Sequence, residues 1–220
     1  MLGLFVSSWS LVNFLYFVKL IFVRHGDTEL NVNEYVQPFS NPLSASGILQ
    51  AKDVAKRLDN YNIDLILSSP LPRTRDTANI INEAVQKDII FNDLLAEVKW
   101  PTELVGKKLD DPKVVQYKRL RNENNIAGSD WHYSDEENFI DLKIRARSLL
   151  NELMGLKGEN ILAVSHSTFM KVVVSVMCHG DNVTWPVYFD ILNFTRPKHT
   201  SISTFYPTND GKWHLDGWNI

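Results

Sequence analysis

The sequence predicts an α/β fold, a sandwich of three layers around a mostly parallel central sheet. Two observations carry this prediction. From Lys19 onward, short apolar runs alternate with segments of helical period, which is typical of parallel strands joined by helices. The 220 residues are 44% hydrophobic and 22% charged, a composition that suits one domain with a sizeable core. No repeat, low-complexity tract or linker divides residues 19–220, so we expect a single domain there.

The expected strands are short and bounded by polar residues. They cover residues 19–23, 63–67, 89–91, 161–164, 200–206 and 213–215. The last two are joined by the turn residues Asn209-Asp210-Gly211, which predict a terminal hairpin.

Helices are expected where apolar residues recur every three or four positions. A first helix follows Ser44 and Ser46, a second contains residues 77–85, a third runs from Phe139 to Leu153, and a fourth covers residues 169–177. The faces predicted to pack on the sheet are Ile48, Ala51, Ala55 and Leu58 in the first helix, Thr77, Ile81, Ala84 and Val85 in the second, and Phe139, Leu142, Ala146, Leu149 and Leu153 in the third.

Charge and cysteine content exclude some classes of protein. The net charge of -3 and the pI of about 6.1 disfavour nucleic acid as a partner, because binding to its backbone draws on a surplus of Lys and Arg. The single cysteine, Cys178, cannot form an internal disulfide, and no Cys/His cluster has zinc spacing. A reducing, cytoplasmic location follows as the expectation, with Cys178 packed in the core.

Residues 1–18 carry no charge and are rich in Leu, Phe, Val and Trp. A signal peptide is disfavoured because no basic residue precedes this run and no cleavage site follows it. A membrane span of about 20 residues would use up the strand at residues 20–23. We therefore expect an extension without an essential role, and keep a peripheral membrane anchor and a membrane span as less favoured alternatives.

Polar residues follow the predicted parallel strands at the point where each strand ends. In open α/β sheets, ligands bind at the carboxyl ends of the strands. Arg24 and His25 follow the first strand, residues 68–78 with Arg73 follow the second, and Ser165-His166-Ser167 follow the fourth, while Glu97 comes after the short third strand.

The blocks at these positions make the chain similar to the histidine phosphatase superfamily, in its phosphoglycerate mutase-like branch. They are Arg24-His25-Gly26-Asp27-Thr28 with Asn31, residues 41–47 with Gln50-Ala51, residues 68–78, Leu95-Ala96-Glu97, and Ser165-His166. An Arg-His-Gly triplet alone is a weak signal, whereas five ordered blocks over residues 20–205 are specific.

The resemblance and the side-chain chemistry together predict a phosphomonoesterase that works through a phosphohistidine. Neutral His25 would attack phosphorus in line. Arg24, Arg73 and Asn31 would bind the phosphate oxygens. The Ser167 hydroxyl would either add a phosphate contact or point to solvent. His166, protonated when phosphate is bound, would be a further donor, of a kind whose removal costs ~2.7–4 kcal/mol. The other histidines, His132, His179, His199 and His214, are expected to be structural or exposed.

Glu97 is the expected proton donor to the leaving alkoxide and later the base for water, with Asp93 and Glu103 as alternative acids. The arginines and histidines supply positive charge at the phosphate, so we expect no metal and no cofactor.

Residues 99–138 are expected to form a partly helical cap, since the resemblance places substrate-covering insertions here. The chain lacks a recognisable mutase-type insertion rich in Arg and Pro, so hydrolysis of a small phosphorylated substrate is favoured. Two alternatives remain: a cofactor-dependent phosphoglycerate mutase, and a phosphate-ligand sensor or scaffold with little turnover. The substrate and the oligomeric state cannot be read from the sequence.

Overall fold

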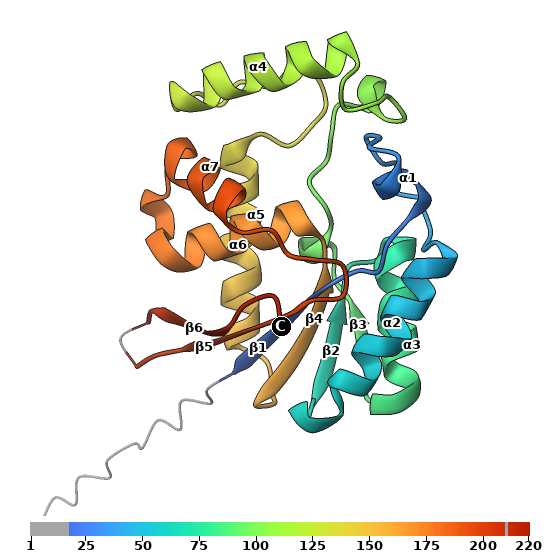
Figure 1. Ribbon diagram of the computed structural model, residues 1–220. Helices are drawn as coiled ribbons and strands as arrows, with labels where there is room; N and C mark the ends of the chain where they lie inside the picture. Colours follow the sequence, from blue (N-terminus) through green and yellow to red (C-terminus); the bar gives the residue numbers. More distant parts are fainter. Residues whose placement is uncertain (1–17, 210) are drawn as a thin grey trace, which may run out of the picture.

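The computed structural model describes residues 18–209 and 211–220 and has one six-stranded sheet of order β3-β2-β4-β1-β5-β6. Its strands are β1 (Lys19–Arg24), β2 (Leu65–Ser68), β3 (Ile89–Phe91), β4 (Asn160–Ser165), β5 (Ile202–Pro207) and β6 (Trp213–Gly217). Strands β1 to β4 pair in parallel, while β5 pairs antiparallel with β1 and with β6. Helices cover both faces of the sheet (Figure 1). The predicted three-layer α/β fold with a mostly parallel sheet is confirmed.

Alternation along β1 shows why this strand lies at the centre of the molecule. Leu20 and Phe22 belong to one apolar cluster, and Ile21 and Val23 belong to the other. Because successive side chains of a strand point to opposite faces, a fully apolar run is buried on both sides.

The two faces of the sheet carry different helices (Figure 1). Helices α2 (Ala45–Arg57) and α3 (Pro72–Val85) cover one face, and α5 (Phe139–Met154) and α6 (Ser167–His179) cover the other. Helix α7 (Trp185–Phe194) packs against α5 and α6 on that second side. The expected buried face of α5 is confirmed at all five positions. The remaining helices of the described residues are the 15-residue α4 (Pro112–Ile126) and five short ones, α1 (Glu29–Val32), η1 (Asp59–Tyr61), η2 (Asp93–Leu95), η3 (Thr102–Leu104) and η4 (Gly180–Asn182).

Some predictions about the elements were wrong. Ile48 is 39% exposed, because Gly47 packs against the backbone of Asp27 and the buried face of α2 continues through Val54 instead. Ala84 is exposed at the end of α3. Cys178 is exposed near the end of α6. Helix α7 was not predicted.

The segment expected to form a cap contains η3 and α4 and has its own small apolar cluster. Val36, Leu104, Val114 and Tyr117 are its buried members. Residues 34–36 pair with this segment through Val36 N–H to Lys107 O and Gly106 N–H to Val36 O, both at 2.8 Å. The α1 loop and the segment at residues 104–109 therefore form one continuous wall.

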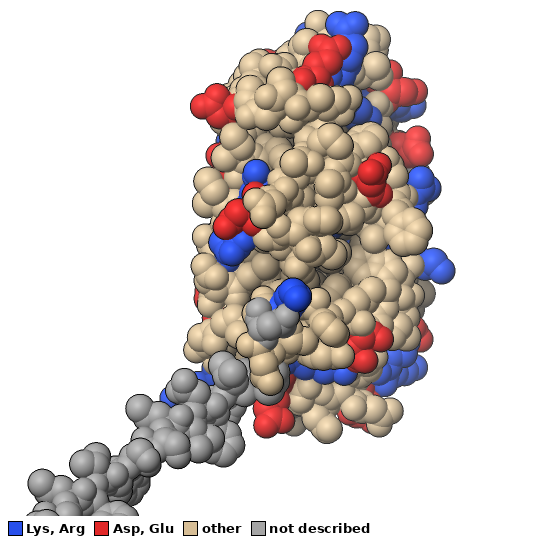
Figure 2. Space-filling view, turned by 90° about the vertical axis from the view of Figure 1, so that its left-hand side faces the viewer, with Lys and Arg blue, Asp and Glu red and all other residues tan. Residues whose placement is uncertain are grey.

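Charged residues on the face seen in Figure 2 are scattered and of both signs, over a surface that is otherwise uncharged. No helix in the described part of the chain is long and apolar enough to cross a bilayer. Residues 1–17 of the predicted extension lie outside the described residues.

Candidate active site

Three neighbouring strands, β2, β4 and β1, bring their carboxyl ends together at one edge of the sheet. Arg24 lies opposite Ser165, and Ser68 lies opposite Val164, so the residues that follow these pairs are placed side by side. The rings of His25 and His166 have centroids 5.0 Å apart. Residues 141 positions apart in the chain thus meet where the sequence predicted.

His25 is buried, with 3% of its surface exposed, and its ring is held in one tautomer. Nδ1 lies 2.6 Å from the carbonyl oxygen of Gly26 and must donate to it, which leaves Nε2 unprotonated in the neutral ring. Burial, with the charges of Arg73 and Arg24 next, holds the pKa of His25 well below its ordinary value. The imidazole is therefore neutral at pH 7, as a nucleophile requires.

Gly26 is required by close packing. A Cβ at this position would lie 2.4 Å from the carbonyl oxygen of Gly47, and a Cβ at Gly47 would lie 2.1 Å from the carbonyl oxygen of Asp27. The two glycines let the first turn of α2 lie directly on the loop that carries His25. Gly26 does not adopt a positive φ, so glycine is needed at this position for the close contact and not for a left-handed backbone conformation.

Arg24 and Arg73 bring two desolvated guanidinium groups to His25. Arg24 donates through Nη1 to the Pro197 carbonyl at 2.8 Å, and burial lowers its pKa to about 10. Arg73, from the first turn of α3, is 2% exposed, and burial lowers its pKa as well. The Nε atoms of both are buried without a hydrogen-bond partner among the described residues. Both groups are suited to binding an anion with two or more oxygens.

His166 is fully buried, and its partner is Ser69 at the end of β2. Nε2 of His166 lies 2.9 Å from the Ser69 hydroxyl, which also accepts from the Leu71 N–H at 3.3 Å. Burial, then the charges of Arg73 and His25, hold the pKa of His166 well below its ordinary value. A neutral ring whose Nε2 accepts from Ser69 carries its proton on Nδ1, which has no partner among the described residues.

Glu97 follows η2 and its carboxylate lies at the N-terminus of α6. Oε1 accepts from Val98 N–H at 2.9 Å and Phe169 N–H at 3.1 Å, and Oε2 accepts from Thr168 N–H at 3.3 Å. The carboxylate is thus both a cap of α6 and part of the wall of the cavity that His25 lines.

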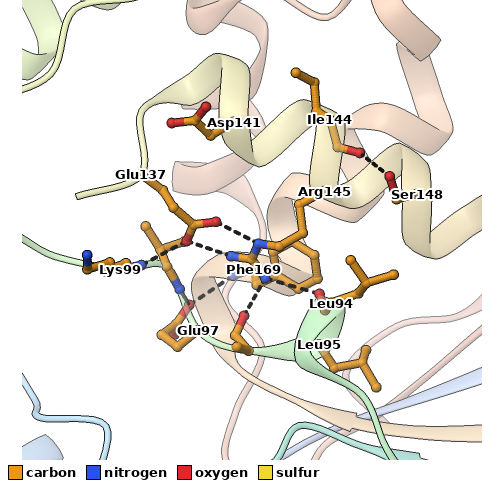
Figure 3. A network of polar contacts seen from close by, with 12 residues as sticks. Leu94, Leu95, Glu97, Lys99, Glu137, Asp141, Ile144, Arg145, Ser148 and Phe169 are labelled. Atoms are coloured by element: carbon orange, nitrogen blue, oxygen red, sulfur yellow. Dashed lines mark hydrogen bonds and ion pairs between the residues drawn. The ribbon is translucent and has the colours of Figure 1, made fainter. Parts of the chain in front are cut away.

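Arg145 of α5 holds the segment that leads to Glu97 (Figure 3). Its Nη1 donates to the carbonyl oxygens of Leu94 and Ala96, at 3.0 and 2.8 Å. Its Nε and Nη2 form a two-pronged ion pair with Glu137, at 2.7 and 2.9 Å. The guanidinium also lies 3.9 Å from the centroid of the Phe169 ring. Sequence reasoning missed this residue, whose contacts come from three separate segments.

A cavity of about 170 Å³ collects most of the predicted residues. Arg24, His25, Asn31, Arg73, Glu97 and Ser167 line it. Asn31 is oriented by the Thr28 hydroxyl, 3.0 Å from its Oδ1, so its Nδ2 is left as a donor. Of the alternative acids, Asp93 and Glu103 do not line this cavity. No group of three or more His, Cys, Asp or Glu residues in the described part of the chain is placed to hold a metal ion.

His199 is a site residue that the sequence did not indicate. Its ring centroid lies 5.8 Å from that of His25, and its Nε2 lies 3.6 Å from Asp27 Oδ1. Burial, with the charge of Arg24 next, lowers the pKa of His199 to about 4. We call His25, His166 and His199 the site histidines. No motif flanks His199, so only the three-dimensional pairing of β5 with β1 could have found it.

Proteins named as probable phosphoglycerate mutases are similar to this chain. The probable phosphoglycerate mutase GpmB of Serratia proteamaculans is 31% identical over 205 residues, covering 92% of this chain and 91% of that protein. The protein of the same name from Proteus mirabilis is 30% identical over 206 residues, with the same shares covered.

Solved structures share the fold. A phosphoserine phosphatase from Entamoeba histolytica superimposes with a TM-score of 0.75 at 25% identity, over 92% of this chain and 96% of that one. The mycobacterial glucosyl-3-phosphoglycerate phosphatase also gives 0.75, at 23% identity, over 92% and 99%. The family model of the histidine phosphatase superfamily (branch 1) matches residues 20–220. The chain belongs to the histidine phosphatase superfamily.

Proposed function

We propose that this protein is a metal-independent phosphomonoesterase that forms a phosphohistidine on His25. The observation that carries the proposal is the state of His25: a buried neutral ring whose Nδ1 is bound to Gly26 O and whose Nε2 is left for the cavity between Arg24 and Arg73. Such a nitrogen has the lone pair and the fixed direction that in-line attack on phosphorus requires.

The reaction divides into two displacements. Nε2 of His25 attacks the phosphorus atom, the ester P–O bond breaks, and Glu97 gives its proton to the departing alkoxide. Water then attacks the phosphohistidine, Glu97 takes a proton from that water, and inorganic phosphate leaves with the P–N bond broken. Arg24, Arg73 and the Nδ1 proton of His166 hold the phosphate oxygens as charge moves between them.

Trapping the intermediate tests the proposal directly. The protein is mixed with a ³²P-labelled phosphomonoester and quenched, and we expect a phosphoprotein that survives alkali and is lost in acid. His25→Ala should abolish both the label and phosphate release, while His214→Ala, at an exposed histidine of β6, should change neither. An unlabelled protein that nevertheless released phosphate would exclude the phosphohistidine.

Metal independence is tested with EDTA. We expect the phosphate release rate to stay within about twofold after chelation, because the guanidinium groups and His166 supply the positive charge. Loss of activity in EDTA and its return with a divalent cation would refute this arrangement.

A cofactor-dependent phosphoglycerate mutase is the second candidate, favoured by the names of the relatives at 30–31% identity. Interconversion of 2- and 3-phosphoglycerate in the presence of bisphosphoglycerate should be slower than phosphate release if the protein is a phosphatase. The reverse order would make it a mutase. Labelling of His25 without turnover would indicate a phosphate sensor instead.

A further inference from the structure

Two adjoining cavities extend outward from the phosphate site. The first, of about 170 Å³, contains His25 and the two arginines. The second, of about 380 Å³, has the apolar side chains Pro38, Phe39, Trp100 and Val105 in its wall. Phe39 and Trp100 line both cavities. A molecule whose phosphate lies at His25 can therefore place the rest of its structure in the second cavity.

The cations in the walls of these cavities are already engaged. Within the described part of the chain they are Arg24, Arg73 and Lys99. The two arginines are assigned to the transferred phosphate, and Lys99 Nζ is paired with Asp135 at 3.1 Å. A substrate with a second anionic group would therefore leave that charge without a matching cation when it enters the second cavity.

The apolar wall is held in place before any substrate arrives. The Trp100 ring lies 5.5 Å from the ring of Tyr117, with the Arg121 guanidinium 5.6 Å from its centroid. On the opposite side, the carbonyl oxygen of Pro38 accepts from Arg73 Nη1 at 3.4 Å, which ties this loop to the phosphate site. A wall that is ordered in advance costs less entropy on binding.

Two large apolar side chains of this wall are exposed to solvent. Phe39 is 41% exposed and Val105 is 36% exposed, although both side chains are large and apolar. Their contact with an apolar group would remove this surface from water.

We propose that the natural substrate is a phosphate monoester of an uncharged alcohol that carries an apolar group of ring size or larger. The phosphate lies at His25 and the apolar group contacts Phe39 and Trp100. This inference rests on the proposed phosphatase function and names the substrate class of that same site.

Steady-state release of phosphate from matched esters tests the substrate class. Ethyl and 2-phenylethyl phosphate have leaving alcohols of similar acidity, so their kcat/KM values differ mainly through contacts of the ring. We expect 2-phenylethyl phosphate to be preferred about tenfold or more over ethyl phosphate, in line with the usual discrimination by apolar pockets. We expect the same preference over 3-phosphoglycerate and over phosphoserine.

A variant at the wall locates the effect. Phe39→Ala should reduce kcat/KM for 2-phenylethyl phosphate about fivefold more than kcat/KM for ethyl phosphate, because the phenyl ring makes the larger apolar contact with this side chain. Leu215→Ala, at an exposed apolar residue of the edge strand β6, is the matched control and should leave both substrates unchanged.

Binding of non-hydrolysable phosphonates separates the two proposals. Isothermal calorimetry should show 2-phenylethylphosphonate binding at least tenfold more tightly than ethylphosphonate. Tighter binding without turnover of any ester would keep the substrate class and refute the phosphatase. Equal kcat/KM values for all esters, or a preference for the two carboxylated ones, would refute the substrate class and leave the phosphatase standing.

Discussion

Replacing Arg145 by methionine is expected to lower both the stability of the fold and the rate of alkyl phosphate hydrolysis. Arg145 bonds to Glu137 at 2.7 and 2.9 Å and to the carbonyl oxygens of Leu94 and Ala96 at 3.0 and 2.8 Å. Methionine keeps the length of the side chain and its packing on Phe169, but it removes all four hydrogen bonds. The change therefore isolates the polar role of this residue.

The magnitude follows from the burial of the ion pair. Breaking a fully buried pair costs about 3–5 kcal/mol, whereas an exposed pair is worth about 0–1 kcal/mol. The side chains of Arg145 and Glu137 are 14% and 22% exposed, and Lys99 N–H still donates to Glu137 at 3.0 Å after the change. We expect a loss of about 2–4 kcal/mol in the free energy of unfolding, which corresponds to a fall in Tm of roughly 4–16 °C for a domain of this size.

The effect on catalysis should depend on the leaving group. Without Arg145 the segment before Glu97 loses two of its anchors, and a misplaced general acid slows a reaction by about 10- to 100-fold. Ethyl phosphate needs that acid and should show this loss in kcat. The leaving group of 4-nitrophenyl phosphate departs without a proton, so its kcat should fall less than about threefold.

The matched control and the double variant decide whether Arg145 acts through Glu97. Arg147→Met removes an arginine of the same helix that pairs with the 84%-exposed Asp181, and it should change neither Tm nor kcat appreciably. Arg145→Met combined with Glu97→Gln should be no slower than Glu97→Gln alone. Equal losses for both esters, or multiplied losses in the double variant, would show that Arg145 supports the fold without positioning the acid.

Three further outcomes are expected. The site histidines have lowered pKa values in the folded protein, so the unfolded chain takes up protons first as the pH drops below about 6.5. The free energy of unfolding should therefore decrease by up to ~1.4 kcal/mol per pH unit for each of these histidines. In urea titrations, His199→Gln should make this pH dependence less steep down to pH 4, since the pKa of His199 in the folded protein is about 4. Arg73→Lys should lower kcat/KM by roughly 10- to 100-fold, because lysine cannot bind two phosphate oxygens at once as a guanidinium group does. Arg75→Lys, at an exposed site on the same helix, is the control and should change kcat/KM less than twofold. Equal effects of the two substitutions would contradict the role of Arg73 in binding phosphate. Gly47→Ala would put a Cβ 2.1 Å from a backbone oxygen and should lower the free energy of unfolding by about 1–3 kcal/mol, as measured by thermal unfolding. Gly155→Ala is the control: its Cβ would have no atom nearer than 3.5 Å, so Tm should not fall.

The sequence could predict the site wherever adjacency follows from the order of parallel strands. His25 and His166 follow strands that pair directly, so their meeting needed no knowledge of side-chain packing. His199 comes from a loop placed by the antiparallel strand β5, and nothing in its local pattern marks it. Arg145 lies on a helix whose apolar period predicted the fold correctly, yet its partners belong to segments that only tertiary packing brings together.

Helix faces show the same limit in another form. The apolar spacing of α2 allows either Ile48 or Val54 to belong to the buried face of the helix. In the structure Val54 is buried and Ile48 is exposed, because Gly47 packs against the loop that contains Asp27. Helix α7 was missed because its pattern is dominated by aromatic residues, three of which pack against Phe139 or one another at its first two turns. Periodicity thus predicts that a helix exists more reliably than which residues it buries.

The state of His166 shows how the geometry changes an expectation about catalysis. The sequence suggested a protonated ring as the phosphate donor, but burial and the charge of Arg73 disfavour the imidazolium in the free protein. The Ser69 hydroxyl accepts from Leu71 N–H and can direct its own hydrogen to Nε2 of His166, so the neutral ring already presents an N–H at Nδ1. A neutral donor can bind the phosphate without first taking up a proton, and the dianion, once bound, offsets the field of the arginines and favours protonation. Ser69 would therefore select the donor tautomer before the substrate arrives. Protonation of His166 then becomes a consequence of phosphate binding rather than a condition for it.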